Sequence, residues 1–151
     1  MCLFEDFSLT IKDRQFVSVV GSNGSGKTSM LNIICGSIPL DSGRIIIGGK
    51  DITSMPEYRR QRRIGRVYQN PAMGTCPHMT ILENMALADN KGKPFNLLPG
   101  TNRQRINYYK EQLHSLGLGL EDKLHVKVGV LSGGQRQAMA LLMSTMTPSN
   151  F

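Results

Sequence analysis

A glycine-rich run with a single lysine has the residue types and spacing of a phosphate site. It reads GSNGSGKT and follows the apolar stretch FVSVV. Gly21, Gly26, Lys27 and Thr28 match the spacing G-x-x-x-x-G-K-[ST], in which glycines let successive backbone N–H groups turn toward one anion. A helix that begins directly after the run would point its positive end at the same anion. The run therefore predicts a phosphate-binding loop.

The residue types in this loop favour a nucleoside triphosphate as the ligand. Lys27 supplies a mobile cation for the terminal phosphates, and the hydroxyl of Thr28 can ligate Mg²⁺. The alternative is a glycine-rich turn without a ligand, but an apolar segment before the loop and a helical pattern after it favour the binding loop. The residues expected to contact the nucleotide are Gly21, Ser22, Asn23, Gly24, Ser25, Gly26, Lys27, Thr28 and Ser29.

A second motif, LSGGQ, lies near the other end of the sequence. It consists of Leu131, Ser132, Gly133, Gly134 and Gln135. Ser132 and Gln135 form an S-x-x-Q capping box, which predicts that a helix begins here. The two glycines leave the helix N-terminus bare, and this favours a second anion contact. An ordinary capped helix is the alternative interpretation, and it is weakened by the phosphate loop upstream.

Several short elements must position these motifs. Apolar, β-branched runs predict strands at residues 7–11, 16–20 and 64–69. The helix after the phosphate loop should cover residues 27–35 and end near Gly36. Gly48 and Gly49 predict a hairpin turn, and Pro56 predicts the start of a brief helix.

The pattern becomes helical after residue 69. TILENMALA opens with a T-x-x-E capping box, and NRQRINYYKEQLHSLG has an apolar face. That face consists of Ile106, Tyr109, Leu113 and Leu116. We therefore predict a phosphate-loop α/β core with N-terminal β-strands at residues 1–69, a helical subdomain at 70–130, and the LSGGQ motif with its helix at 131–151.

Composition bounds the class of protein. The chain has 151 residues, 40% hydrophobic and 19% charged, which is typical of about one globular domain. No apolar run could span a bilayer and no signal peptide is evident, so we expect a cytosolic protein.

The cysteines and the net charge give further expectations. The sequence forms no metal-binding or redox pair from Cys2, Cys35 and Cys76, so these are expected to be free thiols. The net charge is +7, but the basic cluster YRRQRRIGR lacks an aromatic stacking pattern, so nucleic-acid binding is not expected.

Taken together, the motifs resemble those of the ATP-binding subunits of ABC transporters. GSNGSGKT resembles the Walker A motif of this family, and LSGGQ resembles its signature motif. VYQN places Gln69 where the family has its Q-loop glutamine. The resemblance implies an ABC-type P-loop NTPase core with an inserted α-helical subdomain. It also implies ATP and Mg²⁺ as cofactors, with Thr28 and Gln69 at the metal.

The resemblance further implies how such a protein works. Two domains pair head to tail, so that Ser132, Gly133 and Gly134 touch the γ-phosphate bound at the partner subunit's Lys27. A transmembrane permease docks near Gln69, and ATP hydrolysis drives transport. The expected location is cytoplasmic, on the inner face of the cell membrane through the permease. Stretches such as GTCPHMTILEN resemble bacterial importers of amino acids such as tryptophan or tyrosine.

Some family features have no match in this sequence. No apolar strand ending in Asp-Glu, the Walker B motif, follows Ser132, so no catalytic residue is assigned. Phe4 is the candidate for the adenine-stacking aromatic residue. We therefore expect an ABC-type domain truncated at both ends, and ATP hydrolysis by this chain is left open. The alternatives are a non-hydrolysing nucleotide-binding fragment or inert remnant and, less expected, a soluble ABC ATPase acting on nucleic acid or ribosomes.

Overall fold

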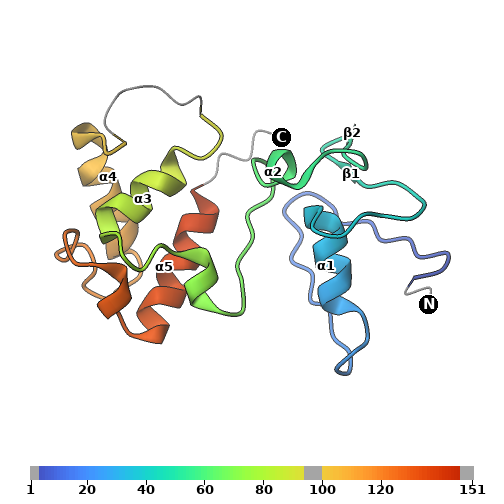
Figure 1. Ribbon diagram of the computed structural model, residues 1–151, viewed down its shortest axis with the longest axis horizontal. Coiled ribbons are helices and arrows are strands. Elements are labelled where there is room, and N and C mark those ends of the chain that lie inside the picture. Colours follow the sequence, from blue (N-terminus) through green and yellow to red (C-terminus); the bar gives the residue numbers. More distant parts are fainter. Residues whose placement is uncertain (1–3, 94–99, 147–151) are drawn as a thin grey trace. The chain divides into compact units, whose positions relative to one another are not determined.

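The computed structural model describes residues 4–93 and 100–146 of the chain (Figure 1). The chain divides into two compact units, Met1–Glu57 and Tyr58–Phe151. The first unit contains the glycine-rich loop and the second contains the LSGGQ motif. Each unit is therefore described by itself.

The helix after the glycine-rich loop forms as predicted. Helix α1 spans Lys27–Cys35. It ends at Gly36, whose backbone N–H donates to the carbonyl oxygens of Asn32 and Ile33. The Cys35 side chain is buried and has a free thiol, as expected from the sequence. Cys76 is also free but exposed, and Cys2 lies outside the described residues.

The first unit also contains the predicted hairpin. Strand β1 (Ile46–Ile47) pairs antiparallel with β2 (Lys50–Asp51), and the turn between them is Gly48-Gly49. The short helix α2 (Glu57–Arg60) begins directly after Pro56, as predicted. It lies in the sequence where one unit ends and the other begins.

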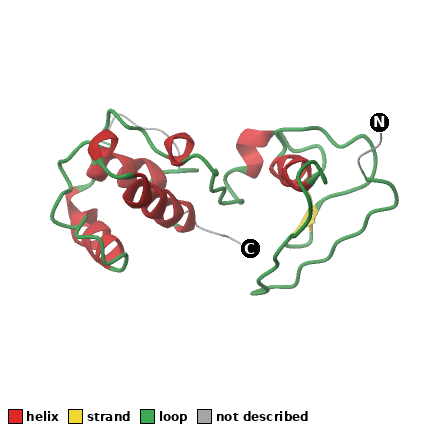
Figure 2. Cartoon of the chain, turned by 90° about the horizontal axis from the view of Figure 1, so that it is seen from below, coloured by secondary structure: helices red, strands yellow, loops and turns green. Residues whose placement is uncertain are grey.

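The longer strands expected at residues 7–11, 16–20 and 64–69 are not formed. Within the described residues, β1 and β2 make the only sheet. Phe16 and Val20 are 91% and 92% exposed, and their segment belongs to no strand. In Figure 2 the strand colour is confined to one small region, and the long segments around it are drawn as loop. Apolar β-branched residues favour a strand only where a second strand supplies the hydrogen-bonding ladder. The prediction of N-terminal β-strands is therefore wrong for this structure, while the boundaries at 69/70 and 130/131 remain predictions.

The second unit is built on three helices that pack together (Figure 1). They are α3 (Ile81–Asp89), α4 (Ile106–His114) and α5 (Gly133–Thr145). The 3-10 turns Pro71–Gly74, Arg103–Arg105 and Val128–Val130 complete the unit. Its core includes Ile81, Met85, Tyr109, Leu113, Leu120, Val128 and Met139. The apolar face predicted for α4 is confirmed. No helix in the described part of the chain is long and apolar enough to cross a membrane.

Local hydrogen bonds fix where α3 begins. The hydroxyl of Thr80 accepts from the backbone N–H of Glu83, and the Glu83 carboxylate accepts from the backbone N–H of Thr80. Asn84 is fully buried, and its side chain bonds both the N–H and the carbonyl of Cys76, at 2.8 and 3.0 Å. The predicted capping box is confirmed, and Asn84 ties the preceding turn to the helix.

A charged cluster joins the end of α3 to the start of α4. Asp89 accepts two hydrogen bonds from the Arg105 guanidinium, at 3.0 and 2.7 Å, and one from the Tyr109 hydroxyl at 2.9 Å. Arg105 also lies over the ring of Tyr108, with 4.1 Å from its central carbon to the ring centroid. This bidentate pair fixes the relative position of the two helices.

Candidate functional site

The glycine-rich loop has a backbone path that side chains would obstruct. Gly24 and Gly26 have φ angles of 84° and 85°, in the left-handed region that residues with a Cβ rarely adopt. A Cβ on Gly21 would lie 2.7 Å from the Ser25 hydroxyl oxygen. The glycines are therefore needed for the loop to take this conformation.

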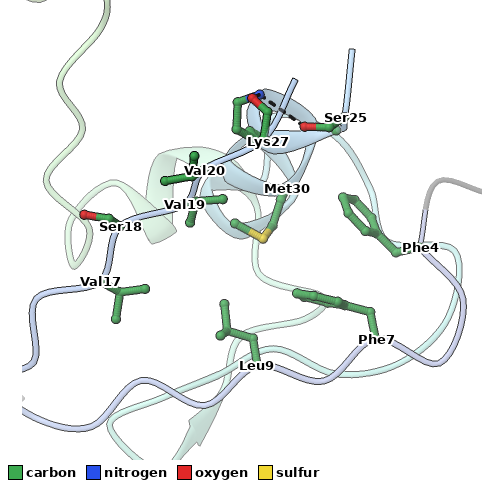
Figure 3. Close-up of a pocket in the computed structure, with 12 residues that line it drawn as sticks. Phe4, Phe7, Leu9, Val17, Ser18, Val19, Val20, Ser25, Lys27 and Met30 are labelled. Carbon is green, nitrogen blue, oxygen red and sulfur yellow. Dashed lines mark hydrogen bonds between the residues drawn. The ribbon is translucent and has the colours of Figure 1, made fainter. Parts of the chain in front are cut away.

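The lysine of the motif is held against the loop. Its Nζ donates to the carbonyl oxygens of Gly21 and Ser22, at 2.7 and 2.6 Å, and to the Ser25 hydroxyl at 3.1 Å. Figure 3 shows the Lys27–Ser25 bond beside the loop. Since an ammonium has three N–H donors, these three bonds satisfy it. The structure thus places the Lys27 charge at the loop, as the motif predicted.

The N-terminus of α1 adds the positive end of a helix to the site, and no side chain competes with an anion for its N–H groups. Gly26 stands at the cap position, no side chain caps the helix, and its first turn has no acidic residue. Thr28 is exposed, and Ser29 is half-buried. Backbone N–H groups, one ammonium and two hydroxyls are the donors and metal ligands that a magnesium-bound triphosphate requires. The residues present therefore fit that ligand.

An open cavity of about 420 Å³ borders this loop (Figure 3). Its lining includes Gly21, Gly26 and Lys27, together with apolar side chains. The apolar lining consists of Phe4, Phe7, Leu9, Val17, Val19, Val20 and Met30. Phe4 and Phe7 lie with their ring centroids 5.4 Å apart. The sequence indicated Phe4 as the aromatic candidate but missed Phe7, which it assigned to a strand.

The LSGGQ motif forms the capped helix start that its spacing predicts. The Ser132 hydroxyl accepts from the backbone N–H of Gln135, and the Gln135 side chain accepts from the backbone N–H of Ser132, both at 3.2 Å. Leu131 is buried in the core of the second unit. Gly133 and Gly134 are exposed, and a Cβ on either would meet no atom within 4 Å. The motif therefore presents an open helix N-terminus.

The two residues expected at the metal belong to different units. Thr28 lies in the first unit, and Gln69 lies in an exposed loop of the second. Their pairing at one Mg²⁺ therefore stays a prediction. In the described ranges, no group of three or more histidine, cysteine or acidic side chains is placed to hold a metal by itself.

Comparison with known proteins places these motifs in one family. The family model described as "ABC transporter" matches residues 4–151. A tyrosine transport ATP-binding protein of Clostridioides difficile is 46% identical over 144 residues, which are 95% of this chain and 57% of that protein. The spermidine/putrescine import ATP-binding protein PotA of Pasteurella multocida is 37% identical over 92% of this chain and 34% of its own length. The chain thus spans less than two thirds of these relatives.

Solved structures agree on the fold. A dimeric ATP-binding cassette in a post-hydrolysis state with ADP and Pi has a TM-score of 0.73 and 30% identity, and the match covers 92% of this chain and 59% of that one. An ATP-binding cassette in its ADP conformation has a TM-score of 0.65 and 28% identity, over 85% and 52% of the two chains. These neighbours confirm the predicted ABC-type P-loop NTPase fold, and the chain belongs to the ABC transporter family.

Proposed function

We propose that residues 21–29 bind MgATP and that the chain forms the nucleotide-binding part of an ABC transporter ATPase subunit. The observation that carries this proposal is the placement of Lys27 on the loop at the uncapped N-terminus of α1. A triphosphate would replace loop carbonyls as the acceptor for the ammonium and would accept from the first N–H groups of the helix. Thr28 would supply an oxygen to the metal.

The open start of α5 supports a role in pairing. Glycine at positions 133 and 134 is not required by packing within the described residues, because a Cβ there would meet open space. A surface left bare in this way suits close approach by a phosphate bound to a second copy of the chain. The solved relative that is dimeric with ADP and Pi bound supports the pairing of two copies. Ser132, Gly133 and Gly134 would then contact the nucleotide held at the partner subunit's Lys27.

The proposal also concerns how the chain would work within a whole transporter. A permease subunit would dock on the second unit near Gln69 and hold the protein at the inner face of the membrane. The tyrosine transport protein, at 46% identity, supports an amino acid such as tyrosine as the cargo. In that assembly, ATP hydrolysis would power transport.

Calorimetry with MgATP tests the binding step. We expect K27A to weaken binding about tenfold or more, because it removes a charged hydrogen-bond donor. K50A is the matched control, since Lys50 is exposed in β2 of the same unit and lies outside the loop, and it should bind as the wild type does. Phosphate release, followed in the same samples, separates hydrolysis from binding alone. Equal affinity in K27A and the wild type would contradict the proposal.

A further inference from the structure

The peptide group directly before the LSGGQ serine is held on both sides by side chains. It joins Leu131 to Ser132. Its N–H donates to the side-chain oxygen of Gln135 at 3.2 Å, and its carbonyl oxygen accepts from the guanidinium of Arg136 at 3.3 Å. Both side chains belong to the start of α5, so the helix itself fixes the direction of this peptide. Arg136 is the residue directly after the motif, so the motif did not predict it.

Arg136 has few partners of its own. Among the described residues, the Leu131 carbonyl is the one hydrogen-bond acceptor of its guanidinium, and no carboxylate forms an ion pair with it. Its side chain is half-buried, and its Nε is buried without an acceptor in the same part of the chain. A buried donor without an acceptor costs free energy. The stability of the fold therefore does not explain an arginine at this position.

The charge of Arg136 also lies at the unfavourable end of its own helix. The N–H groups at the start of an α-helix carry partial positive charge and repel a cation. The bond to Leu131, the residue before the N-cap, places the guanidinium beside the start of α5, and the first turn of α5 contains no acidic residue. Two sources of positive charge at one place favour the approach of an anion.

We propose that Arg136 is a positioning residue for the LSGGQ motif. By holding the Leu131 carbonyl, it fixes the peptide before Ser132 and thereby sets the direction of the Ser132 hydroxyl and of the N–H groups of Gly133 and Gly134. These donors are then in place before a second copy brings its nucleotide, so less freedom is lost when the two copies pair. The inference rests on the pairing role proposed above and adds to it a residue that acts through the motif.

Amide exchange of the nucleotide-free chain, measured by NMR, tests the positioning directly. R136M removes the charge and the donors but keeps an unbranched side chain, whereas R136K keeps a charged donor. We expect the Ser132 N–H to exchange about tenfold faster in R136M and within about threefold of the wild-type rate in R136K, because loss of a charged hydrogen bond releases the peptide. R103M is the matched control, since exposed Arg103 belongs to the same unit and its replacement removes the same charge. An unchanged Ser132 exchange rate in R136M would overturn the proposal.

Pairing in the presence of MgATP distinguishes this role from a purely structural one. Analytical ultracentrifugation should show pairing about tenfold weaker in R136M and restored in R136K, because preorganisation of the donors is lost and regained. The midpoint of thermal unfolding should stay near the wild-type value, since R136M also removes the unsatisfied Nε. Calorimetric affinity for MgATP should stay unchanged, because the nucleotide loop belongs to the first unit.

Two further outcomes separate the inference from the function on which it rests. Wild-type pairing by R136M would overturn the role of Arg136. Absence of pairing by the wild-type chain would instead contradict the function proposed for LSGGQ, and the exchange rate of the Ser132 N–H would still decide whether Arg136 positions the motif.

Discussion

Asp89 shows how one carboxylate sets the protonation of its neighbours. Burial by itself raises the pKa of Asp89, but the hydrogen bonds from Arg105 and Tyr109 outweigh it and hold that pKa below its ordinary value. Burial and the bond to Asp89 in turn raise the pKa of Tyr109 to about 12, from an ordinary value of 10.0. The folded state therefore disfavours the ionised phenol, because Tyr109 is buried beside a negative charge.

This shift predicts a loss of stability at high pH. A pKa that is higher in the folded than in the unfolded chain contributes stability that is complete below pH 10.0 and is lost as pH rises toward about 12. The free energy of unfolding, measured with urea between pH 9 and pH 12, should therefore fall less steeply in Y109F than in the wild type. Y58F is the control, since Tyr58 is exposed and makes no bond to Asp89, and its slope should match the wild type. Matching slopes in Y109F and the wild type would contradict the prediction.

At the scale of elements, the start of α5 contains both residues that stabilise the helix and a glycine that the fold does not need. The capping box of Ser132 and Gln135 already satisfies the helix N-terminus locally. Gly134 lies in the first turn of α5, where it contributes no packing and where alanine has the higher helix propensity. The proposed approach of a nucleotide held by a second copy of the chain would explain a glycine at this position.

Gly134→Ala tests this explanation. We expect the free energy of unfolding to stay the same or to rise by less than about 1 kcal/mol, because alanine favours the helix. ATP-dependent pairing of two copies should be lost, since the new Cβ occupies the bare N-terminus. Thermal unfolding and analytical ultracentrifugation with MgATP measure the two effects. In the contrasting variant G129A, the Cβ would lie 2.9 Å from the Pro77 carbonyl oxygen, so stability should fall. ATP-dependent pairing of G134A at the wild-type level would count against the proposed role.

Elements with local signals were predictable from the sequence, and those that need distant partners were not. The capping boxes at Thr80 and Ser132 correctly predicted where α3 and α5 begin, and Gly36 marked the end of α1. Strands at residues 7–11 and 16–20 depended on a partner ladder that the described residues do not contain.

The same distinction between local and distant signals applies to the candidate sites. The residues of the nucleotide loop are contiguous, so their spacing alone predicted them. Contacts between residues that are distant in the sequence were not predicted, because they form only once the second unit is folded. The pairing of Asp89 with Arg105, sixteen residues away, was missed for the same reason.

At the scale of the whole molecule, the two units differ in the apolar surface that they bury. The main hydrophobic core lies within Tyr58–Phe151 and joins α3, α4 and α5. In the described part of the first unit, the buried apolar side chains are Cys35 and Ile52, while Phe16 and Val20 are more than nine-tenths exposed. Burial of apolar area is the main favourable term in folding, so the second unit should be the more stable.

Hydrogen exchange followed by mass spectrometry tests this difference in stability between the two units. The same measurement with MgATP tests whether the nucleotide stabilises the first unit. Amides of α3 and α5 should exchange slowly, because their opening requires disruption of the core. Residues 7–20 belong to no helix or sheet in the structure and should exchange fastest. MgATP should slow exchange in residues 21–35 of the wild type, since a ligand that binds only the folded loop stabilises it. The same nucleotide should leave exchange in K27A unchanged. Slow exchange throughout both units without nucleotide would show that the first unit has a stability that its buried residues do not account for.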